Sequence, residues 1–386
     1  MRILGASLSG FRNLKEADFT FSPRVNLVLG RNGEGKTNLL EALNYFSLGR
    51  SHRGSKNEEL VGFDQQSLHV RLQVQEESGN VLECEFGLDR SGGRRFRLDG
   101  EAVNRRSDLV GRLATVFFNP DSIQLVRGGP QQRRQFADQG MSETDPLYLA
   151  NLTAFQRTLK QKTGLLRQLK MGQVAFGEAR KELEAWNREM AAHAAVVCLG
   201  RLEYSRLLTP FAAACHRTLT DLENPLEFIY RPRLEAIKKV MDSTDKKLPE
   251  KGHLEGEIFT EIDYIRELEM RRGRPLTGPQ LDDFEVRCSG LDLRAFGSQG
   301  ETRTAAISLI LARSDVLHDR CRIRPVLFFD DIFSELDRER TLRLQEMASQ
   351  LHQVFIATAR RDDVSGWQPE QMKTWTVRAG EFTESD

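Results

Sequence analysis

The first forty residues show the hydrophobic pattern of strands followed by a helix. Residues 3–11 fit a strand, residues 17–21 alternate apolar and polar side chains, and residues 25–29 form a continuous apolar run. Alternation predicts a strand with one solvated face, whereas a short continuous run is typical of a strand buried on both faces. Apolar positions then recur at helical spacing from Leu39 to Phe46. The pattern predicts a strand–loop–helix unit near the N-terminus.

The middle of the chain changes from strand-like to helical periodicity. Residues 67–103 predict an antiparallel meander with glycine-containing turns, and residues 114–118 predict a further short strand. From about residue 145 to 220, apolar positions are spaced three and four apart, which predicts amphipathic helices folded as a hairpin rather than one long coiled coil. The polar stretch 242–256 predicts a loop.

An α/β pattern returns after residue 278. An apolar helix is expected over residues 305–317, and strands are expected over 325–329, 353–358 and 374–377. Strands at both ends of the chain therefore enclose a helical insertion.

Composition limits the class of protein. With 386 residues, the chain has room for two units or for one unit with an insertion. The formal net charge of zero excludes a uniformly polybasic protein, although a local basic face remains possible. The five cysteines are scattered and never spaced as CxxC, which argues against zinc or disulfide frameworks. No membrane-length apolar run or secretory signal is evident, so we expect a cytoplasmic protein.

A phosphate-binding loop lies between the buried strand and the first helix. Residues 30–37 fit GxxxxGK[ST], in the strand–loop–helix context that this motif requires. Its backbone N–H groups can surround a triphosphate, its lysine can contact the β- and γ-phosphates, and its threonine hydroxyl can bind Mg²⁺. The candidate nucleotide-binding residues here are Gly30, Arg31, Asn32, Gly33, Glu34, Gly35, Lys36, Thr37 and Asn38.

Two acidic residues follow the apolar strand near residue 329. Asp330 is a candidate to bind Mg²⁺ together with Thr37, and Asp331 is a candidate to polarise the attacking water. With Lys36, these two aspartates form the candidate catalytic set. Two acids after a strand are more often a helix cap or a solvated loop, but the phosphate-binding loop favours catalysis.

A second anion site is possible at the start of a C-terminal helix. Ser298–Gln299–Gly300–Glu301 precedes that helix, so its N–H groups and the serine hydroxyl can face an anion. Ordinary helix capping would give the same residues. The position of this turn, shortly before the strand that ends at Asp330, favours a functional role for Ser298 and Gly300.

The order of these motifs resembles an ABC-type ATPase head, more closely the SMC-like heads, and within them the RecF family of bacterial DNA repair proteins. The residues that carry the likeness are 10–13, 30–42, 48–53, 118–121, 133–136, 278–283, 298–304 and 330–337.

The resemblance implies an α/β fold: an ABC-ATPase-type P-loop lobe with a mixed sheet, formed by both chain ends, and a helical second lobe without a long coiled coil. The implied boundaries are 1–140 and 276–386 for the ATPase lobe and 141–275 for the helical lobe. It also implies ATP and Mg²⁺ as cofactors, and contact of Arg12 and Asn32 with the nucleotide.

For function, the resemblance implies ATP-dependent dimerisation as a clamp on DNA, with Ser298 acting on the ATP of the other subunit. Slow, DNA-stimulated ATP hydrolysis would release the clamp. Double-stranded DNA and single-strand/double-strand junctions would be bound, and RecO and RecR would help to load RecA at gaps during replication and repair.

Three departures from the family pattern bear on mechanism. The GPHRDD-like segment is GPQLDD here, the fourth signature residue is Glu301 rather than glutamine, and Ala357–Thr358–Ala359 replaces a common histidine. The last departure favours slow hydrolysis or another γ-phosphate sensor. The alternatives are an ABC or SMC-like ATPase that does not act on DNA gaps, such as a transporter subunit, and a module that binds ATP without hydrolysing it.

Because the net charge is zero, any DNA-binding face must come from local basic clusters. Each cluster taken alone is more often an ordinary solvated surface. The candidates are Arg50 with Arg53, Arg94 with Arg95, Arg133 with Arg134, and the group Arg271, Arg272 and Arg274.

Overall fold

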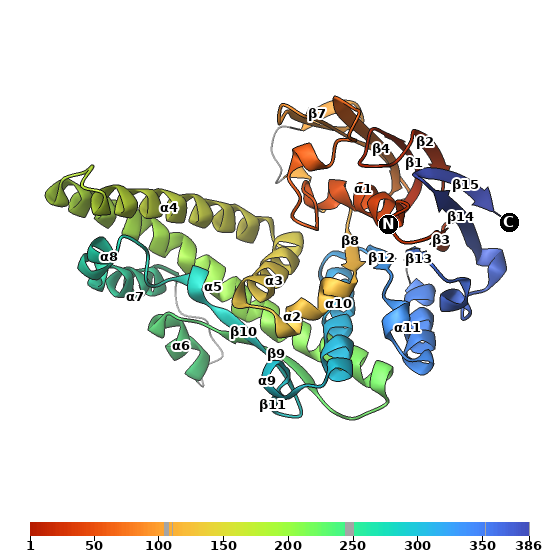
Figure 1. Ribbon diagram of the computed structural model, residues 1–386. Coiled ribbons are helices and arrows are strands. Elements are labelled where there is room, and N and C mark those ends of the chain that lie inside the picture. Colours follow the sequence, from red (N-terminus) through yellow and green to blue (C-terminus); the bar gives the residue numbers. More distant parts are fainter. Residues whose placement is uncertain (104–107, 110, 244–250, 352, 386) are drawn as a thin grey trace. The chain divides into compact units, whose positions relative to one another are not determined.

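The computed structural model describes residues 1–103, 108–109, 111–243, 251–351 and 353–385. The chain divides into two compact units (Figure 1). Unit 1 comprises Met1–Ile123, Phe211–Pro225 and Ser298–Asp386, and unit 2 comprises Gln124–Pro210 and Leu226–Gly297. Both chain ends therefore belong to unit 1.

Unit 1 contains two six-stranded sheets. The first is antiparallel and has the strand order β2-β1-β4-β5-β6-β7. The second has the order β15-β14-β3-β13-β12-β8, in which all neighbours except β14 and β15 are parallel. The strands of the first sheet are β1 (Arg2–Ser9), β2 (Ala17–Thr20), β4 (Ser67–Gln75), β5 (Val81–Asp89), β6 (Arg94–Leu98) and β7 (Glu101–Val103). Those of the second are β3 (Val25–Leu29), β8 (Thr115–Phe118), β12 (Val326–Asp330), β13 (Val354–Thr358), β14 (Met372–Arg378) and β15 (Glu381–Ser385).

Helix α1 (Lys36–Leu48) lies between the two sheets, because it contacts β5 of the first and β8, β12 and β13 of the second. Its apolar side chains, including Leu39, Leu43 and Phe46, are fully buried. Removing large apolar side chains from water is the main stabilising contribution to such a core. The N-terminus of α1, where the phosphate-binding loop ends, is therefore held by both layers of the unit.

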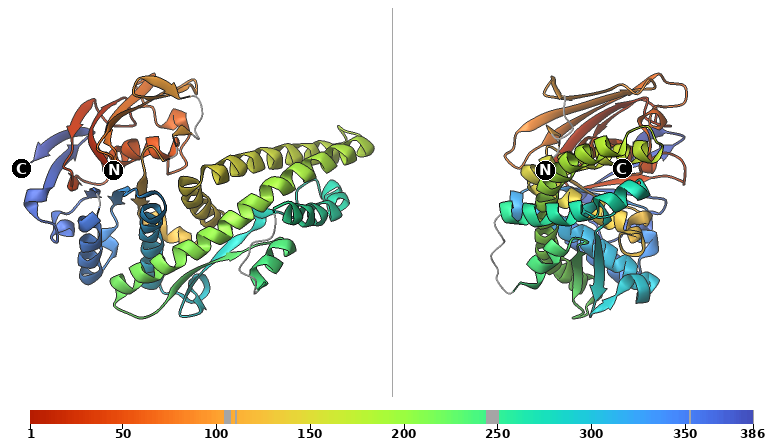
Figure 2. Two further views of the ribbon diagram at one scale, coloured as in Figure 1. Left: turned by 180° about the vertical axis from the view of Figure 1, so that it is seen from behind. Right: turned by 90° about the vertical axis from the view of Figure 1, so that its left-hand side faces the viewer.

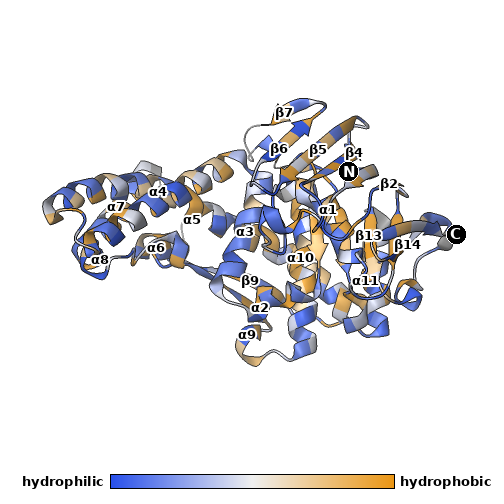
Figure 3. Cartoon of the chain, turned by 45° about the horizontal axis from the view of Figure 1, so that its top comes forward, coloured by the Kyte–Doolittle hydropathy of each residue, from blue (hydrophilic) through white to orange (hydrophobic). Residues whose placement is uncertain are grey.

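Two further long helices complete unit 1. Helix α10 (Gln299–Cys321) packs against β8 and is buried over most of its length, and α11 (Arg338–Leu351) connects β12 to β13. Figure 3 shows hydrophobic colouring on α10 and on β13. A helix that is apolar on nearly all sides is expected in a core.

Unit 2 is mainly helical. Figures 1 and 2 show α4 and α5 side by side as a hairpin, and the Thr158 hydroxyl of α4 donates to Glu189 of α5 at 3.0 Å. Its helices are α2 (Gln124–Arg127), α3 (Pro130–Thr144), α4 (Pro146–Lys170), α5 (Phe176–Thr220, whose last ten residues belong to unit 1), α6 (Glu235–Asp242), α7 (Lys251–Tyr264), α8 (Arg266–Arg272) and α9 (Leu293–Phe296).

Unit 2 also contains a three-stranded antiparallel sheet that the hydrophobic pattern did not predict. Its order is β11-β10-β9, formed by Leu291–Asp292, Asp283–Cys288 and Leu226–Arg231. Because β10 pairs with β9, residues 276–297 belong to unit 2, although the expected boundary assigned them to the ATPase lobe.

The boundary between the units within α5 falls at Pro210. Proline has no N–H to continue the helical hydrogen-bond series, so one backbone hydrogen bond of α5 is missing at this boundary. The predicted loop over 242–256 is wrong for its last part, because α7 begins at Lys251, and residues 244–250 lie outside the described residues. Among the described residues, no helix combines the length and the apolar character needed to span a membrane.

Candidate nucleotide-binding site

Residues 30–35 connect β3 to α1 and form a loop with unusual backbone conformations. Gly33 and Gly35 have φ angles of 84° and 123°, a region that favours glycine. A Cβ atom on Gly35 would also lie 2.8 Å from a terminal methyl carbon of Leu14, so a larger residue would displace that side chain. Gly35 precedes the first turn of α1, where backbone N–H groups lack helical acceptors and can bind an anion.

The Lys36 side chain is folded over this loop. Only 4% of the residue is exposed, and Nζ donates to the carbonyls of Gly30 at 3.0 Å and Arg31 at 3.2 Å. The same ammonium lies 3.8 Å from a carboxylate oxygen of Asp331. The predicted lysine and one predicted aspartate are therefore neighbours.

Thr37 and Asp330 are in direct contact. The Thr37 hydroxyl donates to Asp330 Oδ1 at 2.8 Å. Asp330 is the last residue of β12, which is separated from β3 only by β13, so the carboxyl ends of these parallel strands meet beside the loop. Burial raises the pKa of Asp330 from its ordinary value of 3.8 to about 6, although the hydrogen bond from Thr37 opposes this. A hydroxyl and a carboxylate are oxygen donors, which suit Mg²⁺.

Asp331 has a left-handed backbone, with φ at 51°. Such a conformation is uncommon outside glycine, and it often occurs at functional sites. It is held by a hydrogen bond from the Asp331 N–H to the Ala357 carbonyl at 2.9 Å. Burial raises the pKa of the Asp331 carboxyl, with Lys36 opposing the rise and Asp363 adding to it. A carboxylate with a raised pKa is a better proton acceptor.

Arg12 is fixed by a carboxylate that the sequence motifs did not single out. Glu41 of α1 is fully buried and accepts from Arg12 Nε at 2.7 Å and Nη2 at 3.2 Å. It also accepts from the Ser51 hydroxyl and lies 3.9 Å from Arg53 Nη1. Glu41 therefore joins the end of the first strand to the segment after α1. A glutamate among the apolar positions of the predicted helix, in the second turn of α1, was the available signal.

The remaining loop residues border the same region. Arg31 and Asn32 are exposed, and Glu34 accepts from the Arg31 N–H at 3.2 Å. Asn38 donates to Asn13, whose side chain in turn donates to the Gly33 carbonyl at 3.4 Å. The segment after Arg12 is thus attached to the phosphate-binding loop.

The Ser298 turn is exposed at the start of α10. Ser298 and Glu301 form a reciprocal capping box, with Ser298 Oγ accepting from the Glu301 N–H at 3.2 Å. Ser298 and Gly300 are exposed. In the described part of the chain, no hydrogen bond or ion pair joins this turn to the phosphate-binding loop, so the predicted site residues of the two regions are not brought together within one chain.

One predicted DNA-binding cluster is wrong. Arg133 is only 2% exposed and forms hydrogen bonds to both carboxylate oxygens of Asp283, at 2.8 and 3.0 Å. Its neighbour Arg134 donates to the Asp282 carbonyl. The GPQLDD segment therefore anchors these arginines within unit 2 instead of leaving them free for DNA. Arg50, Arg94 and Arg95 are exposed.

The fold and the geometry of this loop define a class: the P-loop ATPase heads of the ABC and SMC type. A family model described as RecF/RecN/SMC N terminal domain matches residues 3–381. An Smc head bound to a domain of ScpA has a TM-score of 0.57 at 15% identity, covering 100% of this chain and 97% of that chain, which supports the fold alone.

Full-length relatives narrow the class. DNA replication and repair protein RecF of Exiguobacterium sp. is 32% identical over 100% of both chains, and that of Streptococcus pneumoniae (strain CGSP14) is 32% identical over 97% of this chain and 96% of the relative. A solved structure of the recombination mediator protein RecF-ATPrS in the RecFOR pathway has a TM-score of 0.88 at 28% identity, covering 100% and 98% of the two chains. The chain belongs to the RecF family. The expected family and fold class are confirmed, and the transporter alternative is excluded.

Proposed function

We propose that this chain is an ATP-dependent DNA-binding protein of recombinational repair and replication. It dimerises on ATP as a clamp on DNA, and slow ATP hydrolysis releases the DNA. The observation that carries the proposal is the hydrogen bond between Thr37 and Asp330, which joins the end of the phosphate-binding loop to the last residue of β12. The similarity to RecF proteins whose solved structures are described as RecF-ATP and RecF-ATPrS supports ATP as the nucleotide.

Mg²⁺ fits the same pair of residues. Thr37 Oγ1 and Asp330 Oδ1 would hold the ion, since both are oxygen donors at the edge of the phosphate-binding loop. When bound, Mg²⁺ would offset negative charge on the β- and γ-phosphates. The buried Asp330 carboxyl, with a pKa of about 6, would be ionised when it is next to a cation at neutral pH.

In this proposal Lys36 and Asp331 have different roles in hydrolysis. Lys36 would leave the carbonyls of Gly30 and Arg31 to contact the phosphates, because a triphosphate is a stronger partner for an ammonium than neutral carbonyls. Asp331 would accept a proton from the attacking water through its carboxylate. Burial raises the pKa of the Asp331 carboxyl although its neighbour Lys36 opposes the rise, so the carboxylate can accept this proton. Slow turnover is attributed instead to Ala357–Thr358–Ala359, which replaces a common histidine.

Ser298 and Gly300 would complete the nucleotide site of a second subunit. Both residues are exposed at the start of a 23-residue helix, where the Ser298 N–H donates to Glu301. A triphosphate carries several negative charges that two helix N-termini can share. Arg12, held by Glu41, together with Asn32 and Asn38, would contact the nucleotide from the chain's own side.

Family membership supports the proposed partners. RecO and RecR would act with this chain to load RecA at single-strand/double-strand junctions in the cytoplasm, and the pathway named for the related solved structure is RecFOR.

The test is DNA affinity as a function of nucleotide. Fluorescence anisotropy with a labelled gapped duplex should show tight binding with Mg·ATP and weak binding with Mg·ADP or without nucleotide. ATP hydrolysis should be slow without DNA and faster when the duplex is present. Equal affinity in all nucleotide states would overturn the proposal.

A further inference from the structure

Helix α4 of unit 2 is charged with one sign only. Between Pro146 and Lys170 it contains five basic residues and no aspartate or glutamate. Surface helices usually mix both signs, which limits repulsion between neighbouring turns. In a chain whose net charge is zero, this concentration of positive charge is local. It was not among the basic clusters expected from the sequence.

Burial separates these five cations into two groups. Lys162 is fully buried and pairs with the equally buried Glu269 of α8 at 2.7 Å. The other four are exposed and form no ion pair with any residue in the described ranges: Arg157, Lys160, Arg167 and Lys170. The charge of Lys162 is balanced by Glu269 inside the unit, whereas the four exposed cations form no such pair within the described ranges.

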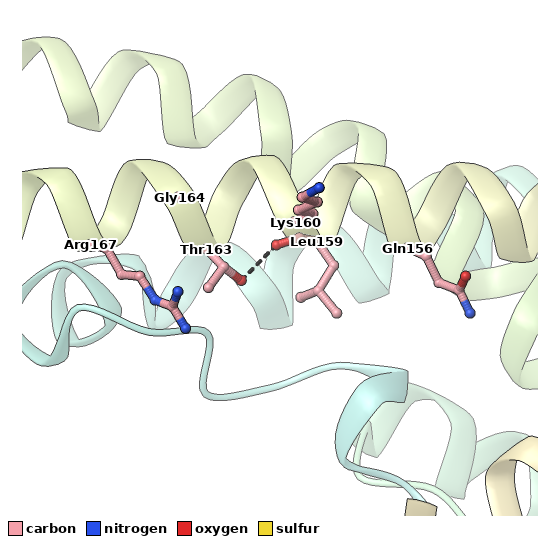
Figure 4. Close-up of a pocket in the computed structure, with 6 residues that line it drawn as sticks. All are labelled: Gln156, Leu159, Lys160, Thr163, Gly164 and Arg167. Atoms are coloured by element: carbon pink, nitrogen blue, oxygen red, sulfur yellow. Dashed lines mark hydrogen bonds between the residues drawn. The ribbon is translucent and has the colours of Figure 1, made fainter. Parts of the chain in front are cut away.

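A shallow groove of about 480 Å³ runs along this side of the helix (Figure 4). Its lining residues are spaced by three and four, so they form one stripe: Gln156, Leu159, Lys160, Thr163, Gly164 and Arg167. A Cβ atom on Gly164 would meet nothing within 4 Å, so the middle of the stripe is open to close approach. The Thr163 hydroxyl is engaged by the Leu159 carbonyl at 2.6 Å, which leaves the cations as the main binding groups.

The positive surface continues onto a second element. A Cβ atom on Gly273 would lie 2.6 Å from Lys170 Cδ, so the residues that end α8 touch the end of α4. Arg271, Arg272 and Arg274 flank that glycine, are exposed, and form no ion pair within the described part of the chain. The two acidic residues of α8 form ion pairs with other residues: Glu267 lies 3.7 Å from Arg180, and Glu269 pairs with Lys162.

We propose that this surface binds the phosphate backbone of double-stranded DNA. We call it the α4 ridge, and it consists of Arg157, Lys160, Arg167, Lys170, Arg271, Arg272 and Arg274. The inference rests on the proposed function and names where the DNA would contact unit 2. At a rise of about 1.5 Å per residue, the basic residues of α4 extend over roughly 20 Å. That length covers about six base pairs of a duplex.

The arrangement of charges favours DNA over a small anion. A free phosphate or nucleotide is bound by donors that converge on one point, often with backbone N–H groups. Along α4 the ridge instead presents separate cations with no acidic residue of that helix between them, which matches a line of phosphates. Arginines and lysines in such contacts position DNA without reading its sequence, so we expect no sequence preference from this surface.

The experiment removes two cations from the groove in the full-length protein. Lys160→Gln with Arg167→Gln is compared with Arg231→Gln with Lys238→Gln, which removes the same charge from two residues that are ion-paired with Glu285 and Glu235. Binding of a labelled gapped duplex is measured with Mg·ATP at several salt concentrations. We expect the groove variant to lose affinity about tenfold or more and the slope of log K against log salt to fall by about 1.8, because two phosphate contacts are lost.

Each outcome has a distinct meaning. If the wild-type protein binds DNA and the groove variant matches the control variant in affinity and slope, the ridge proposal is wrong while the proposed function stands. If the wild-type protein does not bind DNA, both fail. ATP hydrolysis without DNA and the thermal midpoint should match wild type in both variants, since all four side chains are at least partly exposed. Should the double variant be unstable, Lys160→Glu alone carries the same test, with the same loss of affinity expected.

Discussion

Thr37 and Asp330 are 293 positions apart in the chain, and the hydroxyl of one donates to the carboxylate of the other at 2.8 Å. This contact lies where α1 begins and β12 ends, so both terminal segments of the chain are needed to form the site. In the sequence, the helical unit is inserted between the two halves of the candidate nucleotide-binding site. Four consequences of this geometry can be measured.

Thr37→Val should remove Mg²⁺-dependent nucleotide binding while retaining the shape of the side chain. The substitution leaves the buried Asp330 without its hydroxyl donor, so we also expect a loss of stability on the order of 1 kcal/mol. Isothermal titration with Mg·ATP and denaturant unfolding measure the two effects. Thr37→Ser, which keeps the hydroxyl, is the control, and equal nucleotide affinity in both variants would contradict the assignment.

Asp330→Asn should stabilise the nucleotide-free protein at neutral pH. Burial raises the pKa of the folded carboxyl to about 6, above its ordinary value of 3.8, so the folded state binds the proton more tightly than the unfolded state. The resulting penalty is absent below about pH 4, grows as pH rises towards 6, and is complete above it. The amide removes up to about 3 kcal/mol of this cost.

Unfolding by denaturant between pH 5 and 8, without nucleotide or Mg²⁺, checks this sign. The difference in unfolding free energy between Asp330→Asn and wild type should increase with pH and level off near neutrality. The same variant should not hydrolyse ATP. A variant that is less stable than wild type throughout would show that burial does not dominate at this position.

Asp331→Asn should lower the rate of ATP hydrolysis about a hundredfold or more without preventing ATP binding. Asparagine tolerates the left-handed backbone that Asp331 adopts at φ 51°, so the loop can keep its conformation. Steady-state hydrolysis and nucleotide affinity are measured together. Asp362→Asn, an exposed change nearby, is the control. A normal rate of ATP hydrolysis in Asp331→Asn would mean that another group acts as the general base.

Glu41→Gln should weaken ATP affinity about tenfold, because Arg12 loses the carboxylate that fixes its guanidinium. Glu41 acts here as a positioning residue, so adding Arg12→Ala to Glu41→Gln should cause little further loss. Glu58→Gln, on an exposed turn, should behave as wild type. Independent, additive losses from Glu41→Gln and Arg12→Ala would argue that Glu41 serves stability only.

The parts of the fold that local pattern determines could be predicted. The strand, glycine-rich loop and helix around Lys36 are adjacent in sequence, and the buried strand that ends at Asp330 is a continuous apolar run. Asp330 was expected to bind Mg²⁺ together with Thr37 because a carboxylate follows the apolar strand. Arg12 was placed at the site only by family resemblance.

The parts of the fold and of the site that depend on contacts between residues far apart in the sequence could not be predicted. Arg133 was expected at the surface, but its partner Asp283 is 150 positions away, and nothing local to the arginine pair indicates burial. The sheet of β9 and β10 joins two short segments far apart in the chain, without the turn signals of a hairpin. The α4 part of the ridge was missed because its cations are neighbours on a helix surface and not in the sequence, whereas Arg271, Arg272 and Arg274 were expected as a basic cluster.

The most direct test of the central claim is the mass of the protein in solution, by sedimentation or light scattering, with and without Mg·ATP and again with a short gapped duplex. Ser298→Arg is the matched control, since it blocks the exposed turn while leaving the phosphate-binding loop intact. The account predicts a dimer only with Mg·ATP, a dimer that binds the duplex, and a monomer for the variant. A wild-type protein that stays monomeric with Mg·ATP and duplex, or a variant that still dimerises on ATP, would contradict it.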